Sequence, residues 1–262
     1  MKICAACSQE LPKDKFSKKQ WQTKQNRRCK DCIADNRELI LEADAPSADT
    51  PSMSCADGEG GSRFADEDLF KEPPPREECP ICMLLLPILE VSRATTYYAC
   101  CGKVLCMGCV YAGIEADNSR LCPFCRTPPA ASDGEIIERM KERVAAGDAN
   151  SIRLLGCYYR DGEYGMRQNM RKANTLFLRA GKLGNARGYN SIGYAYYNGR
   201  GVEGDTKKAK YYYELAAIGG DIDARHNLGY LEHEAGNTNR AMKHFMIAAS
   251  AGDDESLTKI RE

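Results

Sequence analysis

The sequence predicts a multidomain protein in which small metal-stabilised domains precede an all-α solenoid. Five Cys-x-x-Cys pairs account for most of the 14 cysteines, and all lie within the first 125 residues. Beyond residue 133, glycines, alanines and tyrosines recur at regular intervals instead. Leu, Ile, Val and Phe are scarce, which argues against an enzyme fold built on one large parallel sheet. The predicted fold class is therefore multidomain, with small zinc-bound domains followed by an all-α helical-repeat solenoid.

The sequence contains neither a secretory signal nor a membrane span. Residues 1–4 start no apolar segment, and the longest apolar run, residues 80–89, is short and interrupted by prolines. We therefore expect an intracellular soluble protein, cytoplasmic or nuclear, that makes no contact with a membrane. In such a reducing compartment, regularly paired cysteines are typical of metal sites, not of disulfides.

The net charge of zero is an average over three parts of the chain. Residues 1–32 carry nine basic and three acidic side chains, residues 33–78 carry four and thirteen, and the rest has an excess of three basic groups. The acidic part is rich in Pro, Gly and Ser, which predicts a flexible linker over residues 35–76. Its charge either screens the basic N-terminal part in cis or only keeps the linker solvated.

Residues 1–34 are predicted to form a four-cysteine zinc module. Its ligands are two Cys-x-x-Cys pairs: Cys4, Cys7, Cys29 and Cys32. Four thiolates close a tetrahedral site, so this zinc would fold the module and would not catalyse. Phe16 and Trp21 either form a small core or are exposed stacking platforms.

The same module is rich in lysine and arginine between its cysteine pairs. These side chains either contact the phosphates of a nucleic acid, with salt-sensitive affinity, or only solvate a very small domain. The cysteine pairs, Leu11-Pro12 and residues 16–21 together resemble a zinc domain of fungal heterochromatin adaptor proteins, the Stc family. The resemblance covers about 30 residues and implies a role as a protein or chromatin adaptor.

Residues 77–128 contain eight further cysteines in a specific spacing. They are Cys79, Cys82, Cys100, Cys101, Cys106, Cys109, Cys122 and Cys125. Eight thiolates bind two zinc ions, which brings the predicted total to three zinc ions per chain. The spacing closely resembles a RING domain over residues 79–126, in the all-cysteine variant of the CCR-NOT ligase subunit. The resemblance implies interleaved sites: Cys79, Cys82, Cys106 and Cys109 hold one ion, and Cys100, Cys101, Cys122 and Cys125 hold the other.

The chain departs from the RING pattern at two places. A typical RING has a histidine among its middle ligands, whereas here Lys103 lies near that place and a cysteine is assigned instead. The adjacent Cys100 and Cys101 can face one ion only if a turn forms, which Gly102 permits; otherwise one of them is a free thiol. The tryptophan that many active RINGs carry before the last pair is absent from residues 118–121.

The RING resemblance implies a non-covalent role in ubiquitin transfer. RING ligases hold a ubiquitin-conjugating enzyme and its thioester-linked ubiquitin in a reactive pose. By resemblance, Ile81, Pro123 and Phe124 contact the enzyme, and Arg126 donates hydrogen bonds to both partners. Alternatively, Ile81 and Phe124 only pack between the zinc sites. The sequence offers no Ser or Cys nucleophile next to a suitable histidine, so we expect no covalent catalytic residue.

Residues 133–262 are predicted to contain about three helical repeats. Gly156, Gly193 and Gly229 recur in phase, as do two further sets: Ala180, Ala216 and Ala248, and Gly184, Gly220 and Gly252. Each copy is an antiparallel helix pair. A glycine inside a helix costs about 1 kcal/mol relative to alanine, so its recurrence indicates close helix contact. The tyrosines of this region either interlock in the core or contact a ligand.

Residues 192–217 carry the clearest repeat motif, with Ile192-Gly193, Asn198 to Val202 and Ala216-Ala217. The pattern strongly resembles the Sel-like repeat of the tetratricopeptide superfamily over about residues 147–252. The resemblance implies a concave surface that binds proteins or peptides. A helix at residues 133–140 leads into the repeats, and another begins at residues 256–260, where the end is either truncated or buried in a dimer. Surface or packing roles are predicted for His226, His233 and His244.

These patterns predict a RING-type ubiquitin-protein ligase or a ligase subunit. In this hypothesis residues 79–126 recruit a ubiquitin-conjugating enzyme with its ubiquitin, and the repeats recruit a protein substrate or adaptor. The alternative is a non-catalytic zinc-binding scaffold whose basic N-terminal module contacts chromatin or RNA. Only the first hypothesis predicts autoubiquitination that is lost in Arg126→Ala and Ile81→Ala.

Overall fold

The computed structural model describes residues 2–3, 10–11, 14, 64–86, 94–117 and 120–261. Within the expected N-terminal zinc module, the described part is an antiparallel pair of short strands, β1 (Lys2–Ile3) and β2 (Glu10–Leu11). Four predicted ligands lie outside the described residues: Cys4, Cys7, Cys29 and Cys32. The same is true of residues 35–63 of the expected linker.

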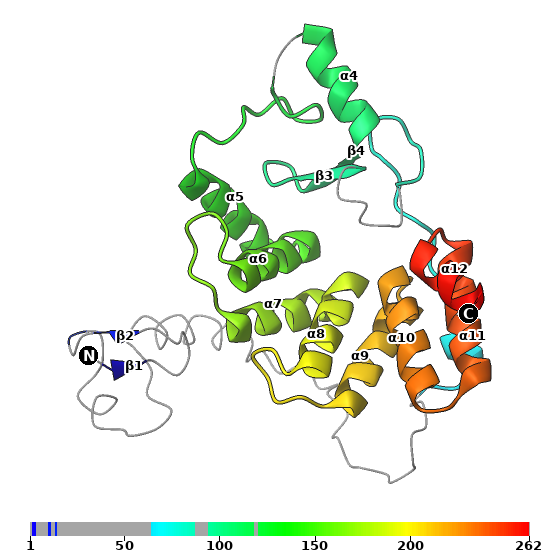
Figure 1. The fold of residues 1–262 in the computed structure, drawn as a ribbon. Helices are drawn as coiled ribbons and strands as arrows, with labels where there is room; N and C mark the ends of the chain where they lie inside the picture. The colour runs from blue at the N-terminus through cyan, green and yellow to red at the C-terminus, as the bar shows by residue number, and fades with distance from the viewer. Residues whose placement is uncertain are drawn as a thin grey trace.

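The part of the chain with eight cysteines, residues 77–128 and hereafter the cysteine module, has little regular structure. Strands β3 (Thr95–Tyr98) and β4 (Lys103–Cys106) form an antiparallel hairpin in which Thr95 is opposite Cys106. Helix α4 (Met107–Asp117) follows directly (Figure 1). Among the described residues, the buried cluster between them consists of Cys79, Leu86, Leu105 and Val110. Such a small apolar cluster does not stabilise a domain by itself, so the fold needs a further source of stability.

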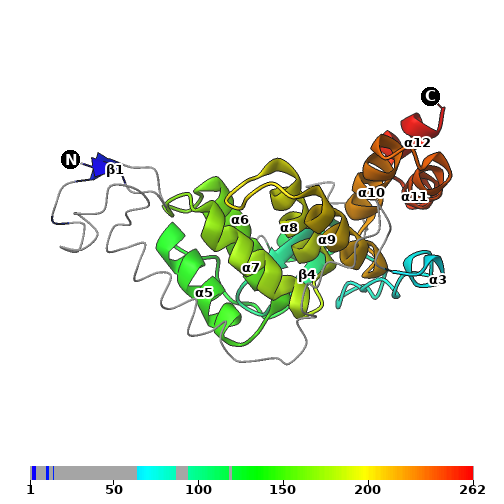
Figure 2. The same ribbon diagram turned by 90° about the horizontal axis from the view of Figure 1, so that it is seen from below.

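The solenoid is a stack of antiparallel helices that continues to residue 261 (Figures 1 and 2). The helices are α5 (Asp133–Ala145), α6 (Ala149–Asp161), α7 (Met170–Lys182), α8 (Ala186–Asn198), α9 (Thr206–Ile218), α10 (Ile222–Glu234), α11 (Thr238–Ser250) and α12 (Asp254–Arg261). Three pairs, α6–α7, α8–α9 and α10–α11, correspond to the predicted repeats. Helix α5 is the leading helix expected at residues 133–140, and α12 is the helix expected at residues 256–260.

Short polar side chains start most of these helices. Five Asp or Asn residues accept a hydrogen bond from the backbone N–H three residues further on: Asp148, Asn169, Asn185, Asp205 and Asp221. Such caps satisfy backbone donors that have no partner inside the helix. The helix starts are therefore encoded locally, at the same place in successive repeats.

Within each repeat, a glycine of the first helix lies against an aromatic ring of the second. The pairs are Gly156 with Phe177, Gly193 with Tyr213, and Gly229 with Phe245. A Cβ atom added at Gly156 or Gly193 would lie 2.7 Å from the ring, closer than real Cβ contacts allow. The close helix contact predicted from the recurring glycines is thus confirmed, and its partner is a phenylalanine or a tyrosine.

The expected flexible linker ends earlier than predicted. Residues 64–72 pack against the solenoid, with a single helical turn, α3 (Asp66–Leu69), whose Leu69 side chain is fully buried. Pro73 and Pro74 then pass close to Gly220. The acidic, proline-rich composition predicts a linker to residue 76. The apolar side chains of Phe64, Leu69 and Phe70 nevertheless attach residues 64–72 to the repeats.

Hydrogen bonds of Arg143 and Tyr97 help to join the cysteine module to the start of the solenoid. From α5, Arg143 donates hydrogen bonds to the carbonyl oxygens of Ala99 (3.1 Å) and Cys100 (2.7 Å). From β3, the Tyr97 hydroxyl donates to Asp148 (2.9 Å) and is also bonded to Ser151. Asp148 is the cap of α6, so one carboxylate serves both the helix start and the contact with the module.

Over the described ranges, no helix combines the length and apolar character needed to cross a lipid bilayer.

Candidate metal centres and protein-binding surfaces

The eight cysteines of the module form two groups of four. Within each group, the four sulfur atoms all lie within 4.8 Å of one another. The first group is Cys79, Cys82, Cys106 and Cys109, and the second is Cys100, Cys101, Cys122 and Cys125. This is the interleaved pairing that the RING resemblance implies, and both groups could hold a metal ion.

The distances between sulfur atoms test whether zinc fits. Tetrahedral zinc with Zn–S bonds of about 2.3 Å separates its sulfur ligands by roughly 3.8 Å. The Cys82 and Cys106 sulfurs are 3.7 Å apart in the first group, and the Cys101 and Cys122 sulfurs are 3.8 Å apart in the second. The Cys100 and Cys125 sulfurs of the second group are somewhat closer, at 3.4 Å. The donor sets and the spacing therefore fit one zinc ion per group.

Local backbone conformations bring the ligands together. Met83 and Arg126, each directly after the second cysteine of a pair, have φ angles of 59° and 62°, which fold both Cys-x-x-Cys loops in the same way. The turn expected at Gly102 is also present, with a φ angle of 71° and a hydrogen bond from its N–H to the Tyr98 carbonyl (2.8 Å). This turn puts both Cys100 and Cys101 into the second group, so neither is left aside as a separate thiol.

The thiols within a group do not ionise equally. Burial raises the pKa of Cys79, but backbone N–H groups, including that of Cys106, outweigh it and lower the pKa to about 6. Burial and neighbouring thiols instead raise the pKa of Cys109 to about 12. The second group has the same asymmetry, because the Thr127 hydroxyl lowers the pKa of Cys125 to about 6 while burial raises that of Cys101 to about 11. Four thiolates at this spacing repel one another, and a bound cation would remove that penalty.

The residues assigned to the conjugating enzyme lie at the module surface. Ile81 and Phe124 are 42% and 44% exposed, so part of each side chain is accessible at this surface. Pro123 is half-buried against α4, and Arg126 is exposed on the turn after Cys125. Ile81, Phe124 and Arg126 are therefore accessible to a partner protein.

Sequence reasoning missed further exposed apolar side chains on the same module. They are Met83, Leu84, Leu85, Tyr111 and Ile114. Together with Ile81 and Phe124 they make up seven of the 13 large apolar side chains exposed in the described chain. Such a concentration on one small module is typical of a protein-binding surface. The run of residues 83–85 directly after Cys82 was the available signal.

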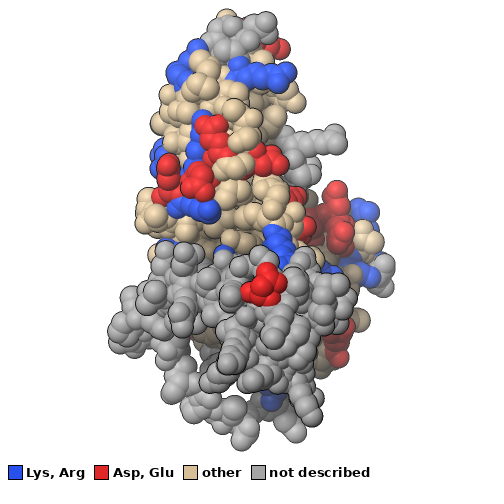
Figure 3. Space-filling model, turned by 90° about the vertical axis from the view of Figure 1, so that its left-hand side faces the viewer, with Lys and Arg blue, Asp and Glu red and all other residues tan. Residues whose placement is uncertain are grey.

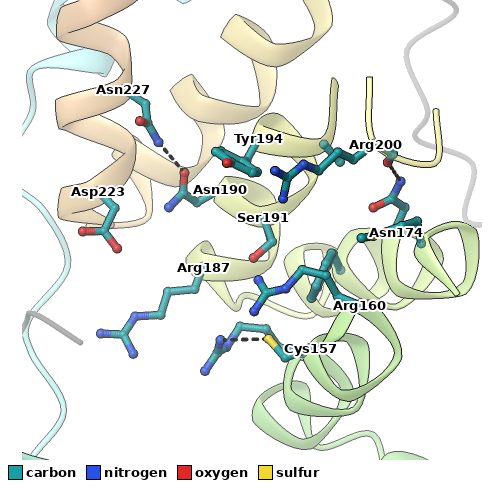
Figure 4. A pocket seen from close by; sticks show the side chains of 14 residues that line it. Cys157, Arg160, Asn174, Arg187, Asn190, Ser191, Tyr194, Arg200, Asp223 and Asn227 are labelled. Atoms are coloured by element: carbon teal, nitrogen blue, oxygen red, sulfur yellow. Dashed lines mark hydrogen bonds between the residues drawn. The ribbon is translucent and has the colours of Figure 1, made fainter. Parts of the chain in front are cut away.

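The solenoid carries a second candidate site on the surface formed by α6, α8 and α10, hereafter the first-helix face. A pocket of about 280 Å³ opens there between α6, α7, α8 and α10. Four arginines line it: Arg153, Arg160, Arg187 and Arg200. Asp223 is the single acidic side chain of its lining. Figure 4 shows Arg160, Arg187 and Arg200 arranged around the recess.

Side-chain amides order the rest of this pocket. Asn227 of α10 donates a hydrogen bond to Asn190 of α8 (3.1 Å), and Asn174 of α7 donates to the Arg200 carbonyl (2.7 Å). Tyr194 is 44% exposed at the rim, where the Arg200 guanidinium lies 5.3 Å from its ring centre. An arginine-rich recess of this kind fits carboxylate groups, which accept paired hydrogen bonds from guanidinium groups.

The tyrosines and histidines of the repeats divide between core and surface. Tyr213 is buried, whereas Tyr194, Tyr197 and Tyr230 are at least 39% exposed on the first-helix face. Tyr213 therefore has the expected core role, and ligand contact by the exposed tyrosines stays a prediction. His244 is fully buried, and His226 is bonded to Asp253 (3.0 Å) and Ser256 (2.7 Å), which agrees with the packing roles predicted for both.

On the side of the molecule that carries α5, charges of both signs are interspersed (Figure 3). Helix α5 contributes the ion pairs Glu135–Arg139 (2.6 Å) and Glu138–Lys141 (2.8 Å). Basic side chains of the described part of this face do not merge into one continuous surface. The basic surface predicted for nucleic acid belongs to the N-terminal module, outside the described residues.

The family model of the Sel1 repeat matches residues 149–185, 186–221 and 222–253. These three matches coincide with the three helix pairs, so the solenoid is built of Sel1 repeats. The chain is similar to a solved Sel1 repeat protein from Oxalobacter formigenes, with 26% identity, 48% of this chain and 96% of that chain covered, and a TM-score of 0.44. It is also similar to c5321, a protective antigen of uropathogenic Escherichia coli strains with an SLR fold, with 20% identity, coverages of 56% and 30%, and a TM-score of 0.47.

Several curated relatives carry names from ubiquitin ligation. The E3 ubiquitin-protein ligase DA2 of Arabidopsis thaliana is 36% identical over 69 residues, which cover 26% of this chain and 16% of DA2. The E3 ubiquitin-protein ligase GW2 of Oryza sativa subsp. indica is 35% identical over 69 residues, with coverages of 26% and 15%. The ERAD-associated E3 ubiquitin-protein ligase component HRD3B of Arabidopsis thaliana is 29% identical over 113 residues, with coverages of 43% and 17%. This chain therefore spans less than a fifth of the length of each relative.

Proposed function

We propose that the chain is a RING-type ubiquitin-protein ligase, or a subunit of one, that acts without a covalent intermediate. The observation that carries this proposal is the pair of interleaved four-cysteine groups on a module whose apolar side chains are exposed. The names of the relatives support a ubiquitin-ligase-related role at the family level. The Sel1 repeats add a surface for protein–protein interaction.

Zinc would be held by the two groups of four cysteines and would supply structural stability. Because each group offers four sulfur ligands, no coordination position remains for a reactive water molecule. Surface side chains of the module would instead bind and orient the conjugating enzyme and its thioester-linked ubiquitin. Ile81 and Phe124 would contact the conjugating enzyme, and the exposed Arg126, with its several N–H donors, would hold ubiquitin and the enzyme in one orientation.

The first-helix face would bind the substrate or adaptor. Its pocket joins four arginines with the Asn190–Asn227 pair, which suits an acidic segment of a partner protein. The Arg143 contacts to Ala99 and Cys100 would keep this face at a fixed distance from the module. The fixed connection between module and solenoid would hold a bound partner near the conjugating enzyme.

A single-turnover discharge assay tests the proposal. The zinc-loaded chain is mixed with ubiquitin-charged conjugating enzymes from a broad panel, and loss of the thioester is followed with time. We expect accelerated discharge by at least one enzyme and a loss of about tenfold or more, or ~1.4 kcal/mol, in Ile81→Ala, Phe124→Ala and Arg126→Ala.

The matched control is Leu183→Ala, because Leu183 is also a large exposed apolar residue but lies on the solenoid. This variant should discharge ubiquitin at the wild-type rate. If the intact zinc-loaded chain accelerates discharge with no member of the panel, the non-catalytic zinc-binding scaffold becomes the better account.

A further inference from the structure

Residues 64–72, hereafter the strap, pack against α9, α10 and α11 of the solenoid. The surface that they cover is hereafter the groove. Figure 2 shows α3 at this end of the helical stack. Leu69 is fully buried there in one cluster with Tyr213 and Ala217 of α9 and Leu228 of α10. A side chain from the acidic part of the sequence thus completes the core between the second and third repeats.

Aromatic residues flank this leucine on both sides. Phe64 stacks on Tyr211, with ring centres 6.1 Å apart and an angle of 10° between the rings. Phe70 lies against His244, with ring centres 4.8 Å apart. The strap therefore packs three apolar side chains against the solenoid within seven residues. Such closely spaced anchor residues are typical of a short peptide ligand and not of a spacer.

The groove is also electrostatically matched to the strap. Three cationic groups lie within 6 Å of the Phe70 ring centre: Arg225 (5.9 Å), Arg240 (5.9 Å) and Lys243 (5.1 Å). Asp66 forms an ion pair with Arg240 and lies 3.8 Å from Lys243. The buried Glu232 holds Arg240 (3.2 Å) and Lys210 (3.0 Å) from the other side. Cations that contact both a carboxylate and an aromatic face select for an acidic segment with a phenylalanine.

The recognition elements all lie in one short pattern, Phe-x-Asp-x-x-Leu-Phe, at residues 64–70. One turn of helix is not stable in isolation, so α3 owes its conformation to the groove. All groups that recognise it, from Tyr211 to Lys243, belong to the solenoid. They are therefore available to any segment that presents the same pattern.

We propose that the groove is a binding site for acidic peptides of the pattern Phe-x-Asp-x-x-Leu-Phe. The strap is its ligand in cis, and a partner protein with this pattern binds by displacing the strap. The site is distinct from the arginine pocket on the first-helix face and requires no ligase activity. Because a short tether gives a ligand an effective concentration on the order of millimolar, the strap competes strongly with a free peptide.

The test uses a fluorescent peptide of residues 62–73 and the full-length chain. In one variant the strap is weakened by Phe64→Ala, Leu69→Ala and Phe70→Ala, and its helical content is checked by circular dichroism. We expect this variant to bind the peptide at least tenfold more tightly than the wild type, which keeps its groove filled. Adding Arg240→Glu should reduce this binding at least tenfold, and a scrambled peptide should not bind.

A second variant keeps the apolar contacts of the strap and should therefore fold like the wild type. Asp66→Lys reverses the charge of an exposed residue and removes the pair with Arg240, so the peptide should bind several-fold more tightly than to the wild type. Glu67→Lys makes the same charge change outside that pair and serves as the matched control. The proposal is overturned if the folded strap variants bind no peptide, or if the wild type binds it as tightly as they do.

Discussion

The cysteine module and the solenoid are stabilised in different ways. The described part of the module has a small buried cluster, and each group of four cysteines joins segments up to about 30 residues apart in the sequence, as from Cys79 to Cys109. The solenoid has a glycine–ring contact in every repeat and an Asp or Asn cap at most helix starts. The module should thus depend on its metal, whereas the solenoid should depend on packing that the metal does not affect.

The largest effect should follow from removing a ligand of the module. Structural zinc sites contribute roughly 10–16 kcal/mol, more than the stability of most domains. We expect Cys106→Ser to lose one zinc ion and all amide protection in residues 94–117, while the helical circular dichroism signal of the solenoid persists. Hydrogen exchange with mass spectrometry measures both parts in one experiment.

Cys157→Ser is the matched control for this experiment. Cys157 lies in α6 near the arginine pocket and belongs to neither sulfur group. Its substitution should leave the zinc content and the protection of the module unchanged. If the Cys106 variant keeps a protected module, the contrast between the two regions is wrong.

A packing substitution should produce the opposite pattern. Gly193→Val places a branched side chain against the Tyr213 ring, and overpacking of this kind costs about 1–3 kcal/mol. We expect a lower urea midpoint for the solenoid and an unchanged zinc content. Gly134→Ala in α5 is the control, because its Cβ would meet only Ser132 at 3.8 Å. An equal loss of stability in both variants would refute the close contact at Gly193.

Arg143 tests the connection between the two regions. Its guanidinium donates to two backbone carbonyls next to the second sulfur group, and hydrogen bonds of charged groups contribute about 1.5–3 kcal/mol. Arg143→Ala should therefore speed zinc release to a chelator several-fold without changing the number of ions bound. Arg171→Ala, an exposed arginine of α7, should release zinc at the wild-type rate. Equal rates in the two variants would mean that the solenoid does not support the module.

The last effect concerns pH and a single histidine. Burial, with a contribution from nearby Arg225 and Arg240, lowers the pKa of His244 to about 3. An unfolded histidine has a pKa near 6.5, so between these values only the unfolded state takes up the proton. The stability contribution is thus complete above about pH 6.5 and is lost as the pH falls toward 3, at a cost of about 2 kcal/mol by pH 5.

The readout is the urea midpoint of the solenoid at pH 7 and pH 5. His244→Gln should remove most of the decrease that the wild type shows between these values, whereas His233→Gln, at an exposed histidine of α10, should retain it. An identical decrease in the two variants would exclude His244 as its source.

The features that sequence analysis predicted are those encoded over short distances. The Cys-x-x-Cys spacing and Gly102 anticipated the two sulfur groups, since each loop is fixed by a few residues. The recurring glycines and alanines anticipated the helix pairs for the same reason. The predicted N-terminal zinc module, the role of Arg126 and the contact with a conjugating enzyme stay predictions.

The features that it missed depend on segments that meet only in the fold. Leu69 and Phe70 occur in an acidic, breaker-rich block, and their partners come from helices about 140 to 175 residues further on. The arginine pocket likewise combines side chains of four helices and a loop. The sequence signal for this contact is the presence of three large apolar residues, Phe64, Leu69 and Phe70, in an otherwise polar block.

The most direct test of the central claim is the number of zinc ions bound to the intact chain, measured by native mass spectrometry after gentle purification. The account predicts three zinc ions for the wild type. The variant Cys4→Ser with Cys7→Ser should retain two, both in the cysteine module. A wild-type chain that carries two zinc ions or fewer, or a variant in which the cysteine module is folded without zinc, would contradict the account.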